Sequence, residues 1–263
     1  MPDLNGKVAI VTGGATGIGA ATSLTLARYG ASVVVAGHHK DGAEIVAERI
    51  RSAGGRATGV GVELADESQV AAMVETAVDE FGGVDGLHNN AAGTREDTMG
   101  SDLDVVNVPV EVWDRTMAIN LRGPFLCCKY AIPEMLKRGG GSIVNASSAA
   151  GLAAERTRVS YGVSKAGVHA LTRHVANAYG KQNIRCNAVA LGMILTEAGS
   201  KNVPPPMLKR LEDHNALGRL GRTDDVAELV AYLFSDAGSF ITGAVIPVDG
   251  GFTSHLPALV DSE

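Results

Sequence analysis

The 263-residue sequence has only three cysteines, Cys127, Cys128 and Cys186. Two of them are adjacent, so they do not suggest a disulfide framework, and the absence of a CxxC motif gives no indication of a metal site. We therefore expect no bound metal, and we predict that the three thiols are free and buried, in the reducing cytoplasm.

Long apolar runs and runs of like charge are also missing. No apolar stretch reaches the length of a membrane span. The N-terminus, MPDLNGKVAIVTGG, lacks the basic region followed by an apolar segment that marks a signal peptide. The formal net charge of −6 argues against a nucleic-acid-binding protein, which usually carries a basic face. We expect a cytoplasmic protein with no membrane or nucleic-acid partner.

Glycine, in contrast, is abundant, with 33 residues in a chain of otherwise ordinary globular composition. Short β-branched apolar runs alternate with amphipathic helical stretches. The strand signals cover residues 7–12, 32–36, 57–64, 84–89, 142–146, 184–190 and 244–248, and the helix signals cover 17–29, 43–53, 66–81, 110–138, 160–180 and 224–235.

This alternation predicts an α/β fold, a Rossmann-like doubly wound parallel sheet of about seven strands with helices on both faces. Runs such as VVV are apolar throughout, as in strands that are buried on both faces. Asp66 and Gln69 have the spacing of a capping box at the start of a helix. Because no repeat, linker or low-complexity tract interrupts the chain, we expect residues 1–263 to form a single domain.

A glycine-rich turn, TGGATGIG, follows the first strand and opens the first helix. Glycines at this place let the backbone approach a pyrophosphate, and the helix N-terminus offers N–H donors and the positive end of its dipole. The spacing is GxxxGxG rather than GxGxxG, and a tight turn alone would also use glycines. The strand-turn-helix placement favours a dinucleotide site.

The end of the second strand leaves the choice of cofactor open between NAD and NADP. An acidic residue there would bind the ribose 2′-hydroxyl of NAD, but the chain reads Gly37-His38-His39-Lys40. The imidazoles and the lysine could bind a 2′-phosphate, or they could form a solvated turn. The glycine-rich turn carries Thr16, so a second positive charge that NADP sites often use is missing there.

Tyr161 and Lys165 lie four residues apart within a helical stretch, which places them on one face, one turn apart. A nearby ammonium stabilises a phenolate and lowers the pKa of the phenol from about 10 toward neutrality. Such a pair can move a proton at neutral pH. The same spacing also occurs on many solvated helix faces, so the pair needs support from other segments.

Four further segments, together with this pair, resemble the short-chain dehydrogenase/reductase family over nearly the whole chain. Tyr161 and Lys165 match its YxxxK motif, and Ser148 lies thirteen residues before Tyr161, where the family has its catalytic serine. Asn120 matches the asparagine of the family's long helix. The segments NNAA (residues 89–92) and LGMILT (residues 191–196) resemble the family's NNAG and PGxIxT segments.

The resemblance implies roles for these residues in hydride transfer between a nicotinamide and a secondary alcohol or ketone. Ser148 would bind the substrate oxygen, Tyr161 would exchange a proton with it, and Lys165 would keep Tyr161 acidic and bind the nicotinamide ribose. Asn120 would hold a water that links Lys165 to solvent. The implied cofactor contacts are Gly13, Thr16, Gly17, Ile18, Gly19, Gly37, His38, Glu63, Leu64, Asn90, Ala91, Ala92, Tyr161, Lys165, Ile194 and Thr196.

The chain departs from the family pattern at three positions. Ala92 replaces a glycine and Leu191 replaces a proline, so the loop paths there should differ slightly. Glu63 stands where the family usually has an aspartate that contacts adenine, and the longer acid could still reach. None of these changes removes a reacting group.

Two segments are expected to line the substrate pocket. Residues 94–109 form a long acidic loop, and residues 197–217 contain three consecutive prolines before a helix-like stretch, as in a lid. Both could instead be variable surface excursions. The helix LRGPFLCCKYAIPEML is apolar around most of its circumference, which predicts a homo-oligomer, with a tetramer common in the family.

Three other functions compete with a secondary alcohol or ketone oxidoreductase. A dinucleotide sensor without catalysis would not need Asn120, Ser148, Tyr161 and Lys165 together. Sugar epimerases and dehydratases of this fold are usually longer, with a larger substrate domain. Enoyl reductases that act on carrier-protein substrates typically space the tyrosine and lysine more widely.

Overall fold

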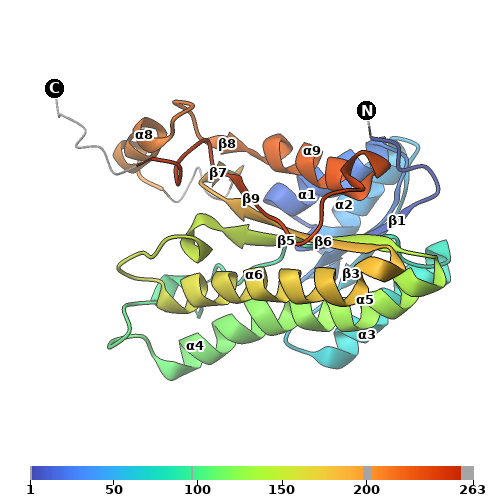
Figure 1. Cartoon of the computed structure of the whole chain (residues 1–263), viewed down its shortest axis with the longest axis horizontal. Helices are drawn as coiled ribbons and strands as arrows, with labels where there is room; N and C mark the ends of the chain where they lie inside the picture. Colours follow the sequence, from blue (N-terminus) through green and yellow to red (C-terminus); the bar gives the residue numbers. More distant parts are fainter. Residues whose placement is uncertain (1, 96, 198–202, 256–263) are drawn as a thin grey trace.

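The computed structural model describes residues 2–95, 97–197 and 203–255. Its middle layer is a seven-stranded parallel sheet with the strand order β3-β2-β1-β4-β5-β6-β9 (Figure 1). The predicted doubly wound sheet of seven strands is confirmed. The strands are β1 Val8–Thr12, β2 Ser32–Gly37, β3 Arg56–Gly61, β4 Gly86–Asn89, β5 Gly141–Ser148, β6 Ile184–Leu191 and β9 Val245–Val248.

Helices cover both faces of the sheet (Figure 1). The apolar side chains of β2 show why, because Val33 and Val35 join the core on one side while Val34 and Ala36 join the core on the other. One face packs against α1 (Gly17–Arg28), α2 (Lys40–Ser52) and α9 (Thr223–Phe234), and the other against α3 (Glu67–Phe81), α5 (Gly123–Lys137) and α6 (Val159–Tyr179). None of the helices in the described ranges is long and apolar enough to cross a membrane. The three cysteines are free and buried.

The helix predicted over residues 110–138 is interrupted. It consists of α4 (Val110–Met117), a π-helical turn η2 (Ala118–Arg122) and α5. Pro124 has no backbone N–H, so it cannot bond to the carbonyl of Asn120 and the regular helical ladder is broken there. Single π-helical turns are frequent at functional sites, and this one contains Asn120.

The third strand and the following helix also differ from prediction. β3 ends at Gly61, so Glu63 and Leu64 lie in the loop after it. The carboxylate of Asp66 accepts hydrogen bonds from the backbone N–H groups of Ser68 and Gln69, as a helix cap should. The reciprocal bond of a capping box is replaced, because Gln69 Oε1 accepts from the backbone N–H of Glu63 at 3.0 Å. This bond fixes the start of the loop that carries Glu63.

The order of the strands reverses between β1 and β4. From β1 the chain proceeds outward through β2 and β3, whereas β4 lies on the other side of β1 and is followed outward by β5, β6 and β9. Open parallel sheets bind ligands at the carboxyl ends of the strands beside such a switch point. The glycine-rich turn after β1 and the NNAA segment after β4 both lie there.

The segment predicted as a lid, residues 197–217, is only partly described, because residues 198–202 lie outside the described ranges. Its helical part is α8 (Pro205–His214). On either side of it, β7 (Ile194–Leu195) pairs with β8 (Gly221–Arg222) in a small parallel sheet. The lid function and the single-domain organisation stay predictions.

Candidate active site

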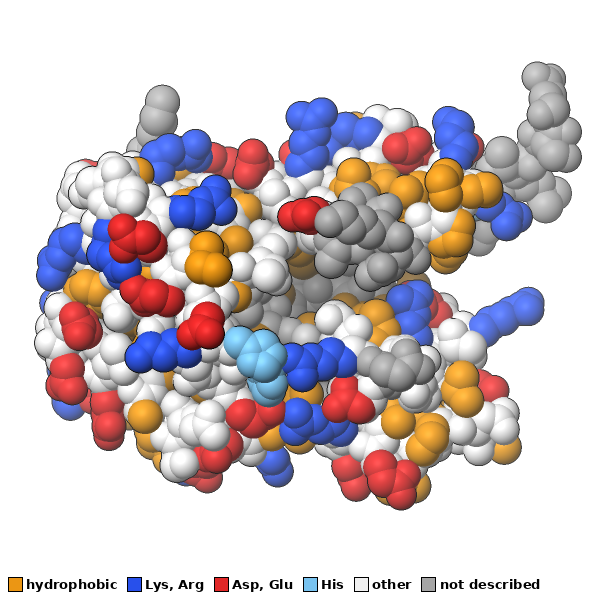
Figure 2. Space-filling view, turned by 180° about the vertical axis from the view of Figure 1, so that it is seen from behind, with side chains coloured by type: hydrophobic (Ala, Val, Ile, Leu, Met, Phe, Trp, Pro, Cys, Tyr) orange, Lys and Arg blue, Asp and Glu red, His pale blue; other side chains and the backbone are white. Residues whose placement is uncertain are grey.

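A cavity of about 1130 Å³ opens at the carboxyl ends of the strands. Figure 2 shows the cleft, with histidine and cationic side chains gathered along one rim. Of the predicted site residues, four do not line the cavity, namely Gly19, Asn120, Ser148 and Ile194. Those that line it are Gly13, Thr16, Gly17, Ile18, Gly37, His38, Glu63, Leu64, Asn90, Ala91, Ala92, Tyr161, Lys165 and Thr196.

The glycine-rich turn forms the floor of the cavity. Gly13 has φ +63, and a Cβ added to it would lie 2.9 Å from Ala91 Cα, so both conformation and close packing require glycine. A Cβ on Gly19 would lie 2.1 Å from the carbonyl oxygen of Gly13. Gly19 therefore packs against the backbone of this turn, outside the cavity lining, at a place where no side chain would fit. Asn90 Nδ2 donates to the carbonyl of Thr12 at 3.0 Å and ties the turn to the end of β4.

The N-terminus of α1 forms part of the wall of this cavity. The N-cap residue Thr16 makes no side-chain capping hydrogen bond, and the first turn of the helix contains no acidic residue. Thr16, Gly17 and Ile18 all line the cavity. Free N–H donors at the positive end of a helix dipole suit a phosphate group. The turn therefore fits the pyrophosphate of a dinucleotide.

Lys165 and Tyr161 lie together at one end of the cavity, one turn apart on α6. Lys165 Nζ is 5.6 Å from the centre of the Tyr161 ring and donates a hydrogen bond to the carbonyl of Ala146 at 2.9 Å. Burial lowers the pKa of the Lys165 ammonium to about 8. At neutral pH the ammonium is therefore charged, but it gives up its proton more readily than an ordinary lysine.

The phenol of Tyr161 behaves differently from the sequence-based expectation. Burial raises the pKa of Tyr161, and a hydrogen bond with Ser148 only partly opposes this. We expected Lys165 to lower that pKa, but the Lys165 ammonium is bonded to Ala146, and the loss of water around the phenolate dominates. Ser148 Oγ also accepts from the backbone N–H of Ala150 at 3.2 Å. In this structure the pKa of Tyr161 therefore lies above that of a free phenol.

Asn120 is fully buried behind the cavity wall. Its Oδ1 accepts from the backbone N–H of Gly93 at 2.8 Å, and its Nδ2 donates to Ser164 Oγ at 3.3 Å. Ser164 Oγ in turn donates to the carbonyl of Tyr161 at 2.7 Å. Asn120 thus connects the loop after β4 to the helix that carries Tyr161.

Asp102, which the sequence did not single out, caps that helix. Its Oδ1 accepts from the backbone N–H of Ser160 at 3.1 Å and from the Ser160 hydroxyl at 2.9 Å. Its Oδ2 accepts from the backbone N–H of Tyr161 at 2.8 Å. Asp102 is 3% exposed, although it belongs to the acidic loop of residues 94–109. This loop therefore positions the start of α6 as well as lining the cavity.

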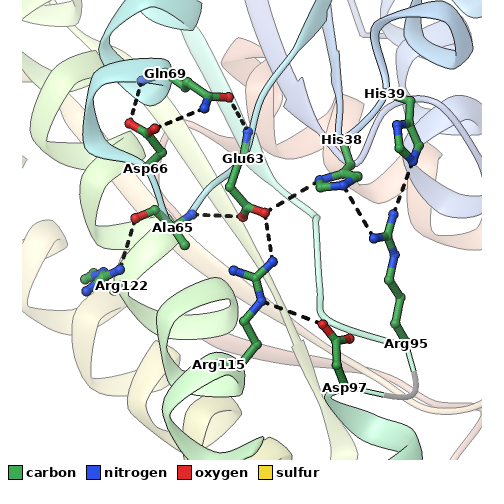
Figure 3. Close-up of polar contacts among 10 residues, drawn as sticks. All are labelled: His38, His39, Glu63, Ala65, Asp66, Gln69, Arg95, Asp97, Arg115 and Arg122. Atoms are coloured by element: carbon green, nitrogen blue, oxygen red, sulfur yellow. Dashed lines mark hydrogen bonds and ion pairs between the residues drawn. The ribbon is translucent and has the colours of Figure 1, made fainter. Parts of the chain in front are cut away.

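The opposite end of the cavity carries a network of charged side chains (Figure 3). Arg115 donates to Glu63 Oε2 at 2.8 Å, and His38 Nδ1 lies 3.7 Å from the same oxygen. Burial raises the pKa of Glu63, but the hydrogen bonds from Arg115 and the Ala65 N–H outweigh it, and the pKa lies below its usual range. Glu63 is therefore an ionised, paired carboxylate at this end.

Arg95 contacts both His38 and His39 at the same end of the cavity (Figure 3). Its Nη1 lies 3.4 Å from His38 Nε2, and its Nη2 lies 3.4 Å from His39 Nε2. The two imidazole rings contact each other edge to face, with centroids 4.6 Å apart. Within the described residues, no group of three or more histidine, cysteine, aspartate or glutamate side chains could hold a metal ion. Sequence reasoning missed Arg95 and Arg115, since no motif marks them.

Comparison with known proteins matches residues 13–253 to a family model described as enoyl-(acyl carrier protein) reductase. Over 99% of its length the chain is 45% identical to a probable short-chain type dehydrogenase/reductase of Bradyrhizobium diazoefficiens, of which it covers 92%. Over 94% of its length it is 42% identical to a cis-4-hydroxycyclohexanecarboxylate dehydrogenase of Sinomonas cyclohexanicum, of which it covers 97%.

Among solved structures, the chain is similar to a 7α-hydroxysteroid dehydrogenase in complex with NADH and 7-oxo glycochenodeoxycholic acid. The TM-score is 0.89, the sequence identity is 34%, and the match covers 95% of both chains. Fold and sequence agree over nearly the full length, so the likeness extends to the elements that form the cavity.

Proposed function

Because the chain belongs to the short-chain dehydrogenase/reductase family, we propose that it interconverts a secondary alcohol and a ketone, with a nicotinamide dinucleotide as hydride carrier. One observation carries this proposal. Tyr161 and Lys165 line one end of a cavity whose floor fits a pyrophosphate, and Ser148 interacts with Tyr161 just outside that lining. The relatives named as dehydrogenases of hydroxylated compounds support oxidoreductase chemistry at a CH–OH group.

Residues on three sides of the cavity would hold the cofactor. The N–H groups after Thr16 would bind the pyrophosphate, Lys165 would bind the nicotinamide ribose, and Glu63 would contact the adenine. When bound, the nicotinamide supplies a hydride to the carbonyl carbon in reduction and takes it from the carbinol carbon in oxidation.

Tyr161 would complete the reaction at the substrate oxygen. During reduction its O–H bond breaks as a new O–H bond forms on the substrate, and during oxidation the same proton returns to Tyr161. Ser148 would hold that oxygen by a hydrogen bond. Because its pKa is raised, Tyr161 carries its proton at neutral pH, as a proton donor must. The role of Asn120 as a holder of water stays a prediction.

The names of the relatives suggest which substrates to test first. They include dehydrogenases of a hydroxycyclohexanecarboxylate, of a dichlorocyclohexadienediol and of a 7α-hydroxysteroid. All of these compounds carry the hydroxyl group on an aliphatic ring. We propose that this chain also acts on an alicyclic secondary alcohol or the matching ketone.

A second candidate is the reduction of an enoyl thioester, because the matching family model carries that description. The four-residue spacing of Tyr161 and Lys165 favours the alcohol reaction, since enoyl reductases typically space the pair more widely. The alternative is tested with crotonyl thioesters.

The experiment measures turnover of cyclohexanols, hydroxycyclohexanecarboxylates, hydroxysteroids and their ketones with NAD(H) and NADP(H), with crotonyl-CoA as the competing substrate. We expect dinucleotide-dependent turnover of at least one alicyclic alcohol or ketone. Reduction of the thioester alone would assign the chain to the second candidate. Dinucleotide binding without turnover of any compound would favour a sensor.

We also propose that the protein is a homo-oligomer, as the apolar helix predicted. In α5 much of the apolar circumference is buried within the chain, but Phe125 and Leu136 remain 49% and 40% exposed. These side chains support an interface on this helix. Light scattering after size exclusion would give the mass, and a tetramer is the expected result.

A further inference from the structure

The two ends of the cavity bind different parts of the dinucleotide, if the proposed function holds. Tyr161 and Lys165 mark the end where the nicotinamide reacts, and the turn after β1 holds the pyrophosphate. The adenosine must then reach the end formed by His38, Glu63 and Arg95. The ribose 2′ position of a dinucleotide lies beside the end of the second strand of this fold.

The carboxylate that would select a free 2′-hydroxyl is absent from the end of β2. Gly37 occupies the last position of the strand, and His38 and His39 follow it on the cavity wall. A Cβ on Gly37 would lie 3.1 Å from the Cβ of Ala15, so any side chain at position 37 would be crowded by Ala15. Glu63, the acid nearest to His38, is already paired with Arg115.

The two arginines at this end differ in how their charge is balanced. Arg115 is 2.8 Å from Glu63 and 3.9 Å from Asp97. Arg95 has no carboxylate partner within the described residues, and its contacts are the two imidazoles at 3.4 Å. These distances exceed the usual 2.7–3.2 Å of an N–H hydrogen bond, so the contacts are weak. Arg95 is therefore an exposed cation that is free to exchange imidazole for a stronger acceptor.

We propose that Arg95 is the residue that selects a dinucleotide with a 2′-phosphate, so that the protein prefers NADPH to NADH. The guanidinium can give two parallel N–H bonds to a phosphate dianion, which is its favoured geometry. His38, beside it, supplies a further donor to the same group. A 2′-hydroxyl offers neither the charge nor enough acceptors to replace the imidazoles.

The position of Arg95 explains why the glycine-rich turn can lack a basic residue. Thr16 stands in that turn, and the second positive charge comes instead from the loop after β4, 57 residues beyond His38. Arg95 therefore acts from the loop after β4, on the same rim of the cleft as the two histidines (Figure 3). The loop that caps the helix of Tyr161 through Asp102 also carries Arg95, so one segment serves both ends of the cavity.

The test is a calorimetric titration of the full chain with NADPH, NADH, adenosine 2′,5′-bisphosphate and 5′-AMP. Wild type is compared with Arg95→Ala and with Lys40→Ala. Lys40→Ala tests the other cation that the sequence leaves open as a 2′-phosphate ligand, since Lys40 is exposed next to His39 but lies outside the cavity wall. The adenosine bisphosphate isolates the adenosine end from the nicotinamide end.

Wild type should bind NADPH at least about tenfold more tightly than NADH, and the bisphosphate more tightly than 5′-AMP. Arg95→Ala should lose about 10- to 100-fold in affinity for the two 2′-phosphorylated ligands. The affinity of Arg95→Ala for NADH and 5′-AMP should change less than about threefold. Lys40→Ala should keep the preference for 2′-phosphorylated ligands within about threefold of wild type, because its charge is exposed and screened.

Three results would overturn the proposal while the proposed function stands. Wild type could bind NADH as tightly as NADPH, Arg95→Ala could weaken all four ligands equally, or Lys40→Ala could lose the preference as fully as Arg95→Ala. If wild type binds none of the four ligands, the proposed function itself is wrong, and the inference falls with it.

Discussion

The two ends of the cavity are built in different ways. At the reacting end, Tyr161 and Lys165 come from one helix and Ser148 from the end of β5, within eighteen residues, and Lys165 is 3% exposed. At the adenosine end, His38, Glu63 and Arg95 come from three separate loops and keep contact with solvent. In the proposed function, residues with short-range spacing would carry the chemistry, and contacts between distant segments would carry recognition of the cofactor.

This difference has a consequence for stability. The reacting end buries an ammonium, and the protein keeps it charged at a cost in folding free energy. The charged side chains at the adenosine end are paired or exposed to solvent. Such ion pairs contribute little to the free energy of folding. Substitutions at the two ends should therefore be separable, and three predictions test this, from the largest effect to the smallest.

Lys165→Met should lower turnover by more than about 100-fold while raising stability by roughly 1–3 kcal/mol at pH 7. The variant removes a buried ammonium whose pKa is lowered to about 8 from 10.5. Between these values the unfolded wild-type chain binds more protons than the folded chain, so wild-type stability rises with pH in that window. Chemical denaturation at pH 7 and pH 10 measures the free energy of unfolding. The difference in this free energy between wild type and variant should be smaller at pH 10 than at pH 7.

Lys181→Met is the control for this prediction, since Lys181 is an exposed lysine in the turn after α6 that lies outside the cavity wall. It should leave turnover unchanged and stability within about 0.5 kcal/mol. A Lys165→Met variant that is less stable than wild type at pH 7 would contradict the buried-charge account.

Asp102→Asn should lower kcat about tenfold and stability by about 1 kcal/mol. The amide keeps the shape of the side chain but has one acceptor oxygen for three donors on Ser160 and Tyr161. The start of α6 should loosen and Tyr161 should lose its position, while dinucleotide affinity stays the same.

The readouts for Asp102 are kcat at saturating ligand well below the melting temperature, the dissociation constant of the cofactor, and the denaturation midpoint. Asp114→Asn is the exposed control on α4. Equal losses in kcat and cofactor affinity would show that the loop does not act through Tyr161.

Arg115→Gln should weaken NADH and NADPH binding by about two- to fivefold each, the scale of a partly exposed ion pair. The ratio of the two affinities should not change, because Arg115 is committed to Glu63. Calorimetry measures both affinities, with Arg56→Gln on β3 as a control away from the cavity wall. A fall in kcat at saturating cofactor would mean that the two ends are coupled.

Much of the fold could be predicted from sequence, because parallel strands buried on both faces have a distinct apolar pattern. The interruption of the long helix could not, since AINLR has no residue that is incompatible with an α-helix. It follows from Pro124, whose missing N–H affects the turn before it, and from the buried bonds of Asn120 to Gly93 and Ser164.

At the site, the residues with short-range spacing could be placed in advance. Arg95 and Asp102 could not, because their partners lie 57 and 58 residues away and no pattern links them. The sequence predicts a lowered pKa for Tyr161, but the structure gives a raised one. The spacing to Lys165 indicates that the two side chains are close, but it does not indicate how far burial removes water from the phenol.

We propose that Tyr161 performs the proton transfer at the substrate oxygen, so that its phenolic O–H matters more for the rate than for cofactor binding. The most direct test is single-turnover hydride transfer with Tyr161→Phe, on whichever alicyclic substrate wild type accepts, together with calorimetry of the cofactor. The account predicts a loss of about 10²- to 10⁴-fold in rate with a nearly unchanged dissociation constant. Turnover within about threefold of wild type would contradict it.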